Sequence, residues 1–87
     1  MYIVIVYDVE QKRVNKICQF LRQYLNWVQN SVFEGEVSEG QFWKIKARIN
    51  KLINKNKDSV LIYKTRSQKW LEKEVIGIEK NFTSNLI

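Results

Sequence analysis

The segment that decides the fold is the first eight residues, Met1 to Asp8, which read MYIVIVYD. A short apolar run rich in β-branched residues is typical of a strand, and a run that is apolar on both faces belongs in the middle of a sheet. Side chains alternate along a strand. The two expected faces are Tyr2, Val4 and Val6 on one side and Ile3, Ile5 and Tyr7 on the other. Asp8 stands where the strand leaves the core, which makes it a candidate site residue.

The length of the chain bounds its organisation. With 87 residues it is the size of one small domain, so we expect a single domain over 1–87, with a core at 1–66 and a C-terminal strand and tail at 67–87. A core this small gives marginal stability, which a homodimer would relieve. The sequence holds no apolar run near the roughly 20 residues of a membrane span, and we expect a cytoplasmic protein.

The residue types present exclude several kinds of site. Cys18 is the only cysteine, which excludes an internal disulfide and a cysteine-based zinc site. The sequence has no histidine, the commonest general base and zinc ligand. Cys18 falls in the apolar stripe of a predicted helix, so we interpret it as a small buried thiol rather than a reactive one.

The net charge of +6 is concentrated in one segment. Between Gly40 and Lys57 there are six basic residues and no acid. Four of them recur on one face of a predicted helix and form a candidate nucleic-acid contact: Lys44, Arg48, Lys51 and Lys55. The alternative is a merely solvated face, but the lack of interspersed acids favours polyanion binding.

Three further elements follow the first strand. An apolar stripe at helical spacing predicts a helix over 13–25. Residues 27–37 have extended character and form either one kinked strand or two short ones, with Asn30-Ser31 and Gly35 as possible bends or bulges. Ser38-Glu39-Gly40-Gln41 matches a capping box, so a second helix should begin there and end over 54–57.

The last third of the chain completes the predicted fold. Asp58 to Thr65 is interpreted as a second strand buried on both faces, 64–69 as a polar connector, and Glu74 to Ile78 as a short last strand before an apolar-ended tail at 83–87. The element order predicts an α+β fold of the ferredoxin-like βαββαβ type, with two helices on one face of an antiparallel sheet.

With these residues placed, the chain resembles the CRISPR-associated Cas-two family, the small subunit of the machinery that acquires spacers. Four motifs in order carry the resemblance, and the third is the most specific. They are Ile5-Val6-Tyr7-Asp8-Val9, Arg13-Val14-Asn15-Lys16, Val28-Gln29-Asn30-Ser31-Val32-Phe33-Glu34-Gly35-Glu36 and Asp58-Ser59-Val60-Leu61-Ile62-Tyr63. Glu74-Val75-Ile76-Gly77 also resembles the late family segment that crosses to the partner subunit.

The resemblance implies a homodimer that exchanges its C-terminal strands and associates with the Cas-one integrase on duplex DNA. It also implies a magnesium- or manganese-dependent endonuclease acting on RNA or DNA, with Asp8 as the metal-binding, catalytic aspartate. Trp27 departs from the family pattern, because many members carry an arginine there. Arg13 and Ser31 are candidate phosphate-side residues, and Ser31 could equally be a turn serine.

The chemistry of the residues leaves alternatives open. Without histidine a divalent metal must supply much of phosphodiester cleavage, and a two-fold axis could pair Asp8 with its symmetry mate. Asp8 could instead be a strand-end aspartate that accepts amide hydrogen bonds. The alternative functions are a non-catalytic dimeric DNA-binding scaffold and a VapD-type toxin ribonuclease. A base-stacking RNA module is disfavoured, because 58–65 lacks the glycine-aromatic motif of such modules.

Overall fold

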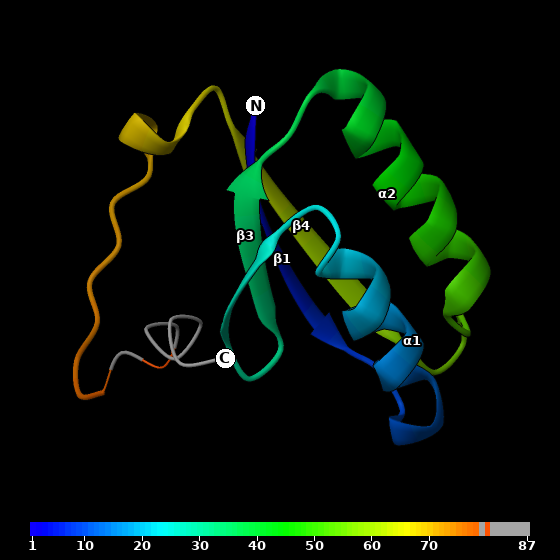
Figure 1. Ribbon diagram of the computed structural model, residues 1–87. Coiled ribbons are helices and arrows are strands. Elements are labelled where there is room, and N and C mark those ends of the chain that lie inside the picture. The colour runs from blue at the N-terminus through cyan, green and yellow to red at the C-terminus, as the bar shows by residue number, and fades with distance from the viewer. Residues whose placement is uncertain (79, 81–87) are drawn as a thin grey trace.

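The chain folds into four strands and two α-helices in the order βαββαβ (Figure 1). The structure is a computed structural model that describes residues 1–78 and residue 80. The elements in chain order are β1 (Tyr2–Asp8), α1 (Gln11–Leu21), β2 (Asn26–Gln29), β3 (Val32–Glu36), α2 (Glu39–Leu52), β4 (Ser59–Thr65) and a short 3-10 helix, η1 (Gln68–Trp70). This is the predicted ferredoxin-like α+β order.

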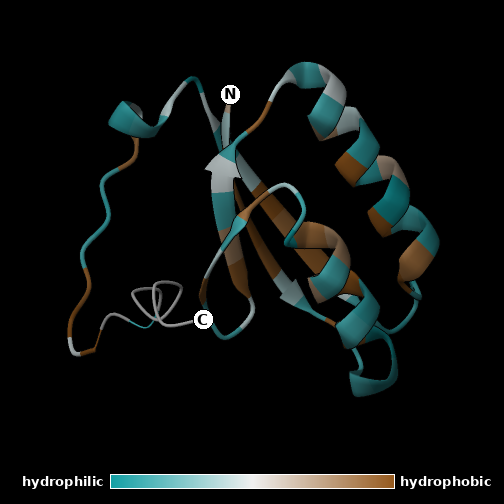
Figure 2. Ribbon diagram, in the orientation of Figure 1, coloured by the Kyte–Doolittle hydropathy of each residue, from teal (hydrophilic) through white to brown (hydrophobic). Residues whose placement is uncertain are grey.

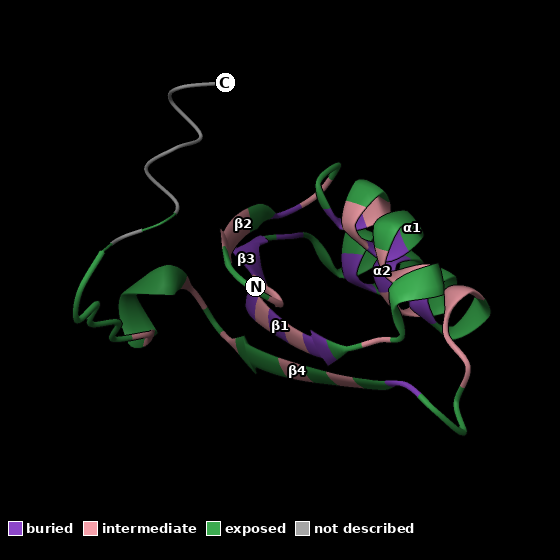
Figure 3. Cartoon of the chain, turned by 90° about the horizontal axis from the view of Figure 1, so that it is seen from below, coloured by how far each residue is buried: buried purple, intermediate pink, exposed green. Residues whose placement is uncertain are grey.

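The four strands form one antiparallel sheet in the order β2-β3-β1-β4, and both helices lie on the same side of it (Figure 3). β1 therefore lies inside the sheet, as the sequence predicted. In Figure 2 the central strands are largely hydrophobic, whereas the helices alternate between hydrophobic and hydrophilic residues. The helices thus cover the sheet with their apolar sides.

The two faces of β1 have different environments. Ile3 and Ile5 face the helices and are fully buried against Phe33 of β3. Val4 and Val6 point to the opposite side and are only half-buried. Residues directly opposite in the strand pairs share that side, which we call the open face. It comprises Tyr2, Val4, Val6, Asp8, Val32, Glu34, Glu36, Ser59, Leu61, Tyr63 and Thr65.

The first helix is shorter at its C-terminal end than the sequence predicted. α1 ends at Leu21, and the chain then turns: the Gln23 amide donates to the Phe20 carbonyl, and the Leu25 amide donates to the Leu21 carbonyl. Leu25 stays buried in the core although it is not helical. The apolar spacing continued past the helix because the turn also faces the core.

The segment after α1 forms two strands rather than one kinked strand. β2 and β3 meet at a tight turn in which Asn30 has a φ of 42°, a left-handed conformation that asparagine tolerates better than most residues. The capping box is confirmed: the Gln41 amide donates to Ser38 Oγ, and the Gln41 side chain accepts from the Ser38 amide. The bend predicted at Asn30-Ser31 is also confirmed, whereas Gly35 lies in register within β3 and the irregularity in strand pairing falls between Trp27 and Gln29.

The sequence interpretation was wrong for two C-terminal segments. β4 lies at the edge of the sheet. It is not buried on both faces, because Leu61 is 52% and Tyr63 58% exposed on the open face. Residues 74–78 form no strand within the single chain; Ile76 is 95% and Ile78 75% exposed. The predicted tail at 83–87 lies outside the described residues. Within residues 1–78 and 80, no helix is long and apolar enough to cross a membrane.

Candidate functional site

Asp8 is the last residue of β1 and lies on the open face, exposed to solvent. Its cross-strand partner is Ser59, the first residue of β4. Among residues 1–78 and 80, the Asp8 carboxylate makes no hydrogen bond or ion pair. The structure therefore does not support the alternative in which Asp8 accepts amide hydrogen bonds as a structural cap. Its carboxylate is available to an external ligand.

Ser31 lies at the same end of the sheet as Asp8. The Tyr7 amide donates to the Ser31 carbonyl over 3.0 Å, which places Ser31 beside the residue that precedes Asp8. Ser31 belongs to the β2–β3 turn and is half-buried. Asp8 and Ser31 thus lie at the same end of the sheet. The contact of Ser31 with a phosphate stays a prediction.

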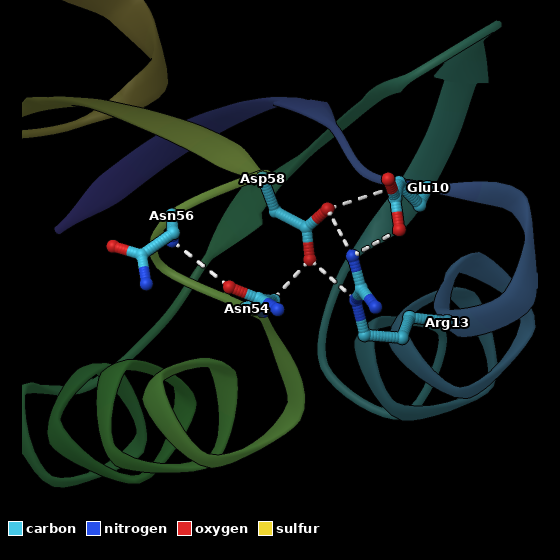
Figure 4. A network of polar contacts seen from close by, with 5 residues as sticks. All are labelled: Glu10, Arg13, Asn54, Asn56 and Asp58. Carbon is cyan, nitrogen blue, oxygen red and sulfur yellow. Dashed lines mark hydrogen bonds and ion pairs between the residues drawn. The ribbon is translucent and has the colours of Figure 1, made fainter.

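Asp58, which the sequence placed at the start of a strand and of the fourth motif without assigning it a role, is the centre of a buried polar network (Figure 4). Its side chain has no exposed surface. Arg13 donates from Nε to Oδ2 over 2.6 Å and from Nη2 to Oδ1 over 2.8 Å. The amides of Glu10 and Asn54 donate to the same carboxylate over 3.0 and 2.8 Å. All these partners except Asn54 are more than 40 residues away in the chain, so no local pattern could have revealed them.

This network holds in place the two segments next to Asp8, which are the loop after β1 and the start of β4. The Glu10 amide belongs to the loop after β1, and Asp58 directly precedes Ser59, the cross-strand partner of Asp8. The hydrogen bonds from Arg13, aided by the two backbone amides, hold the pKa of the Asp58 carboxyl well below its usual range. Asp58 is therefore ionised and bound at neutral pH, and the loop that carries Asp8 is anchored.

Arg13 lies in this network rather than on a free surface. Its Nη2 also contacts Glu10 Oε1 at 2.8 Å, and its side chain is only 18% exposed. The donors Nε and Nη2 are therefore engaged by carboxylates of the same chain. The predicted phosphate-side role of Arg13 stays a prediction, and its observed role is to join α1 to the start of β4.

The predicted basic stripe lies on the helical side of the molecule, across the sheet from Asp8. Lys44, Arg48 and Lys51 are exposed on α2, and Lys55 follows the end of the helix. The stripe extends toward α1, because Arg48 shares a groove between the two helices with five other residues. They are Lys16, Gln19, Phe20, Gln23 and Leu52. The candidate polyanion surface and Asp8 are thus two separate sites on one chain.

Two further residues have structural roles. Trp27, whose role the sequence left open, donates from Nε1 to the Asn30 carbonyl over 3.1 Å and so braces the β2–β3 turn. Cys18 is half-buried, and its Sγ lies 3.0 Å from the Tyr7 hydroxyl. Burial, followed by this contact, raises the pKa of Tyr7 well above its ordinary value. Cys18 was predicted to be buried; it packs against the core but is only half-buried.

A divalent metal fits this chain only in part. Within the part of the chain that the structure describes, no three His, Cys, Asp or Glu side chains are grouped so that they could hold a metal ion. Magnesium commonly keeps several waters and needs only one or two carboxylates. One exposed Asp8 is a weak donor set, whereas two Asp8 side chains from neighbouring copies would fit.

Known proteins share the sequence pattern and the fold of this chain. Residues 1–73 match the family model described as "CRISPR associated protein Cas2". The chain is 56% identical to a protein of Pyrococcus furiosus and 53% identical to one of Methanosarcina acetivorans, over the full length of all chains; both are named "CRISPR-associated endoribonuclease Cas2". A solved structure titled "Crystal structure of cas2" superposes with a TM-score of 0.85 at 41% identity, covering 92% of this chain and 90% of that one. The chain belongs to the CRISPR-associated Cas2 (Cas-two) family.

Proposed function

We propose that this protein is a CRISPR adaptation protein that binds duplex DNA with the Cas-one integrase. We also propose that it is a metal-dependent endonuclease whose site lies at the axis of a homodimer. The observation that supports the nuclease most directly is Asp8, an exposed carboxylate without a polar partner among the described residues, held at the end of a buried central strand. The names of the relatives, which are endoribonucleases, support the same activity.

The open face supports a homodimer. Exposed Leu61 and Tyr63 lie on it, and Ile76 and Ile78 of the segment after η1 are exposed as well. A second copy that covers this face would bury these side chains, and an added strand would protect the free edge of β4. Because Asp8 lies on the same face, a two-fold axis through it would bring the two Asp8 carboxylates together.

The two Asp8 side chains would hold the ion in this arrangement. Unpaired carboxylates repel each other at short range, so a shared cation relieves a cost that the dimer would otherwise carry. When bound, magnesium would offset charge on the phosphate oxygens and activate a water molecule. Asp8 would position that charge at the two-fold axis, and the Asp58 network keeps its loop in place.

The basic helices support the second part of the proposal. Lys44, Arg48 and Lys51 are exposed on α2, which lies on the side of the sheet opposite the open face, so they stay accessible in a dimer built through the open faces. Contacts of this kind go to phosphates and read no sequence. A purely structural scaffold remains the alternative function, whereas family membership argues against a VapD-type toxin.

A cleavage assay separates nuclease from scaffold. Wild-type protein is incubated with labelled single-stranded RNA and with duplex DNA, with magnesium or with a chelator. The proposal expects chelator-sensitive cleavage of at least one substrate. Duplex binding without any cleavage would leave the scaffold function and contradict the nuclease.

Truncation after Lys69 tests the dimer. It removes Val75, Ile76 and Ile78 and is expected to give a monomer or a weakened dimer by analytical ultracentrifugation, with cleavage reduced in parallel. The full-length Ile76→Lys variant is the matched control for loss of chain length. Ile76 is 95% exposed in the single chain, so this variant should leave folding unchanged and still weaken the dimer. A truncated chain that stays a tight dimer at micromolar concentration would contradict the exchange.

Charge reversal on α2 tests the DNA surface. Replacing Lys44, Arg48 and Lys51 by glutamate is expected to weaken duplex binding and to lower the salt slope by about one unit for each phosphate that the variant no longer neutralises. The glutamine variants, which remove the charges without adding repulsion, should show the same slope with a smaller loss of affinity. Unchanged affinity and slope would show that the stripe is solvated surface only.

A further inference from the structure

An exposed tryptophan stands near the beginning of α2. Trp43 is 64% exposed, although its neighbour Phe42 is 7% exposed and belongs to the core. Lys46 Nζ lies 4.3 Å from the centroid of the Trp43 ring and 5.1 Å from that of Phe42. A cation over one ring face orients the indole while most of its surface stays accessible.

A second exposed tryptophan, Trp70, has basic neighbours of its own. Lys64 of β4 places its Nζ 5.3 Å from the Phe42 ring, and it lines a hollow together with Thr65, Arg66 and Trp70. Trp70 is also 64% exposed, and Lys69 Nζ lies 6.0 Å from its ring. Lys64 thus lies between Trp70 and Phe42, and Lys46, which also contacts Phe42, continues the series to Trp43. We call Trp43, Lys46, Lys64 and Trp70 the aromatic–basic patch.

The segment that carries this patch, residues 40–71, holds almost only positive charge. From residue 40 to residue 71 the only acid is Asp58, which is buried and bound to Arg13. The nearest acids outside this segment are Glu39, one helical turn before Trp43, and Glu72, two residues after Trp70. Exposed aromatics among cations are typical of surfaces that bind nucleic acid strands, since the cations contact the phosphates and the rings stack on bases.

We propose that the aromatic–basic patch binds single-stranded nucleic acid by stacking unpaired bases on Trp43 and Trp70. The inference deepens the proposed function, because it states which form of nucleic acid this surface accepts. Duplex backbone is bound by cations and polar groups, and the bases of a duplex are already stacked on one another. Exposed indole rings contribute to binding only where a base offers a free face.

The patch lies at the end of the sheet opposite Asp8. Lys64 pairs with Ile3, whereas Asp8 is five residues further along β1, about 17 Å at the rise of a strand. The patch is an additional binding site and not part of the candidate metal site.

Binding to a labelled oligonucleotide of roughly 10 nucleotides tests this inference. Fluorescence anisotropy is measured in an Asp8→Asn background, with a single strand and with a blunt duplex of the same length. Trp43→Leu is expected to weaken single-strand binding by about 5- to 100-fold, without changing the salt slope. Duplex affinity should stay within about two-fold. Trp43→Phe, which keeps an aromatic face, should restore most of the loss.

Tryptophan emission provides a second measurement. The chain has three tryptophans, and the third, Trp27, is half-buried and bonded within its own turn. Single strands should quench the wild-type emission and leave the emission of Trp43→Leu/Trp70→Leu unchanged. Equal losses for single strand and duplex, or no loss for either, would overturn the inference. So would a Trp43→Leu variant that loses only binding to the integrase, because the patch would then be a protein-docking surface.

These outcomes are independent of the nuclease proposal. Binding is measured in a variant that is not expected to cleave, so absence of cleavage in the wild type would contradict the nuclease and leave the stacking result unaffected. Circular dichroism confirms that each variant is folded, which we expect because Trp43 and Trp70 are exposed.

Discussion

Asp8→Asn is expected to lower magnesium-dependent cleavage by more than about 100-fold. Loss of a residue that merely supports a metal ligand typically costs 10- to 100-fold, and here the ligand itself is lost. The fold should be unaffected, because the Asp8 side chain is exposed and has no polar partner among the described residues. The measurement is the rate of cleavage of single-stranded RNA at saturating magnesium, with a chelator control.

Glu10→Gln provides the matched control for Asp8→Asn. It makes the same change of charge two residues further along the chain, where the carboxylate contacts Arg13 at 2.8 Å. Its side chain is 42% exposed, so the effect on cleavage should be small. Chelator-sensitive activity that persists in purified Asp8→Asn, at the wild-type rate, would show that the site lies elsewhere.

Asp58→Asn is expected to cause the largest loss of stability of any single change considered. Asparagine presents one acceptor oxygen where the carboxylate accepts four hydrogen bonds, and it leaves the charge of Arg13 without its buried partner. Breaking a buried ion pair by removing one partner is strongly destabilising. In a domain of this size we expect the midpoint of thermal unfolding to fall by about 10 °C or more.

The loss of stability in Asp58→Asn should depend on pH. The Asp58 carboxyl has a pKa well below its usual range in the folded chain, whereas in the unfolded chain its pKa returns to about 4. The stabilisation is therefore complete above that pH and is lost as the pH falls toward the lower, folded value. The gap between wild type and Asp58→Asn should be wide at neutral pH and narrow progressively in acid. A gap that is independent of pH would mean that packing, not charge, is responsible.

The sequence predicted those parts of the fold that depend on short-range patterns. The apolar run before Asp8 predicted the central strand, and Ser38 with Gln41 predicted the start of α2 from a pair of reciprocal hydrogen bonds. The four motifs predicted the family, which the family model and full-length relatives confirm. Asp8 is noticeable as a lone carboxylate after a buried strand, but its metal-binding role was predicted from the family motif, because residue type alone favours a strand-end aspartate.

The parts that the sequence did not predict depend on long-range contacts. The run 60–63 is apolar both in a central strand and in an edge strand, so composition could not show that Leu61 and Tyr63 would be exposed. Asp58 reads as an ordinary acid before a strand until Arg13 is seen beside it. The helix end after Leu21 was misplaced because Leu25 continues the spacing while already facing the core from a turn.

The placement of both helices on one side of the sheet has a consequence for how the proposed dimer would handle nucleic acid. Joining two copies through their open faces turns the helical layers outward in opposite directions and encloses the two Asp8 residues between them. The dimer would then have two basic outer surfaces, formed by the helices, and an acidic interface that contains the two Asp8 side chains. We call this interface the acidic seam. A rigid double helix can lie along an outer surface without reaching the seam, whereas a narrow, flexible strand can enter at its rim. Binding and cleavage would thus act on different parts of a nucleic acid. A duplex bound to an outer surface would not reach the nuclease site and would not be cleaved by the protein that binds it.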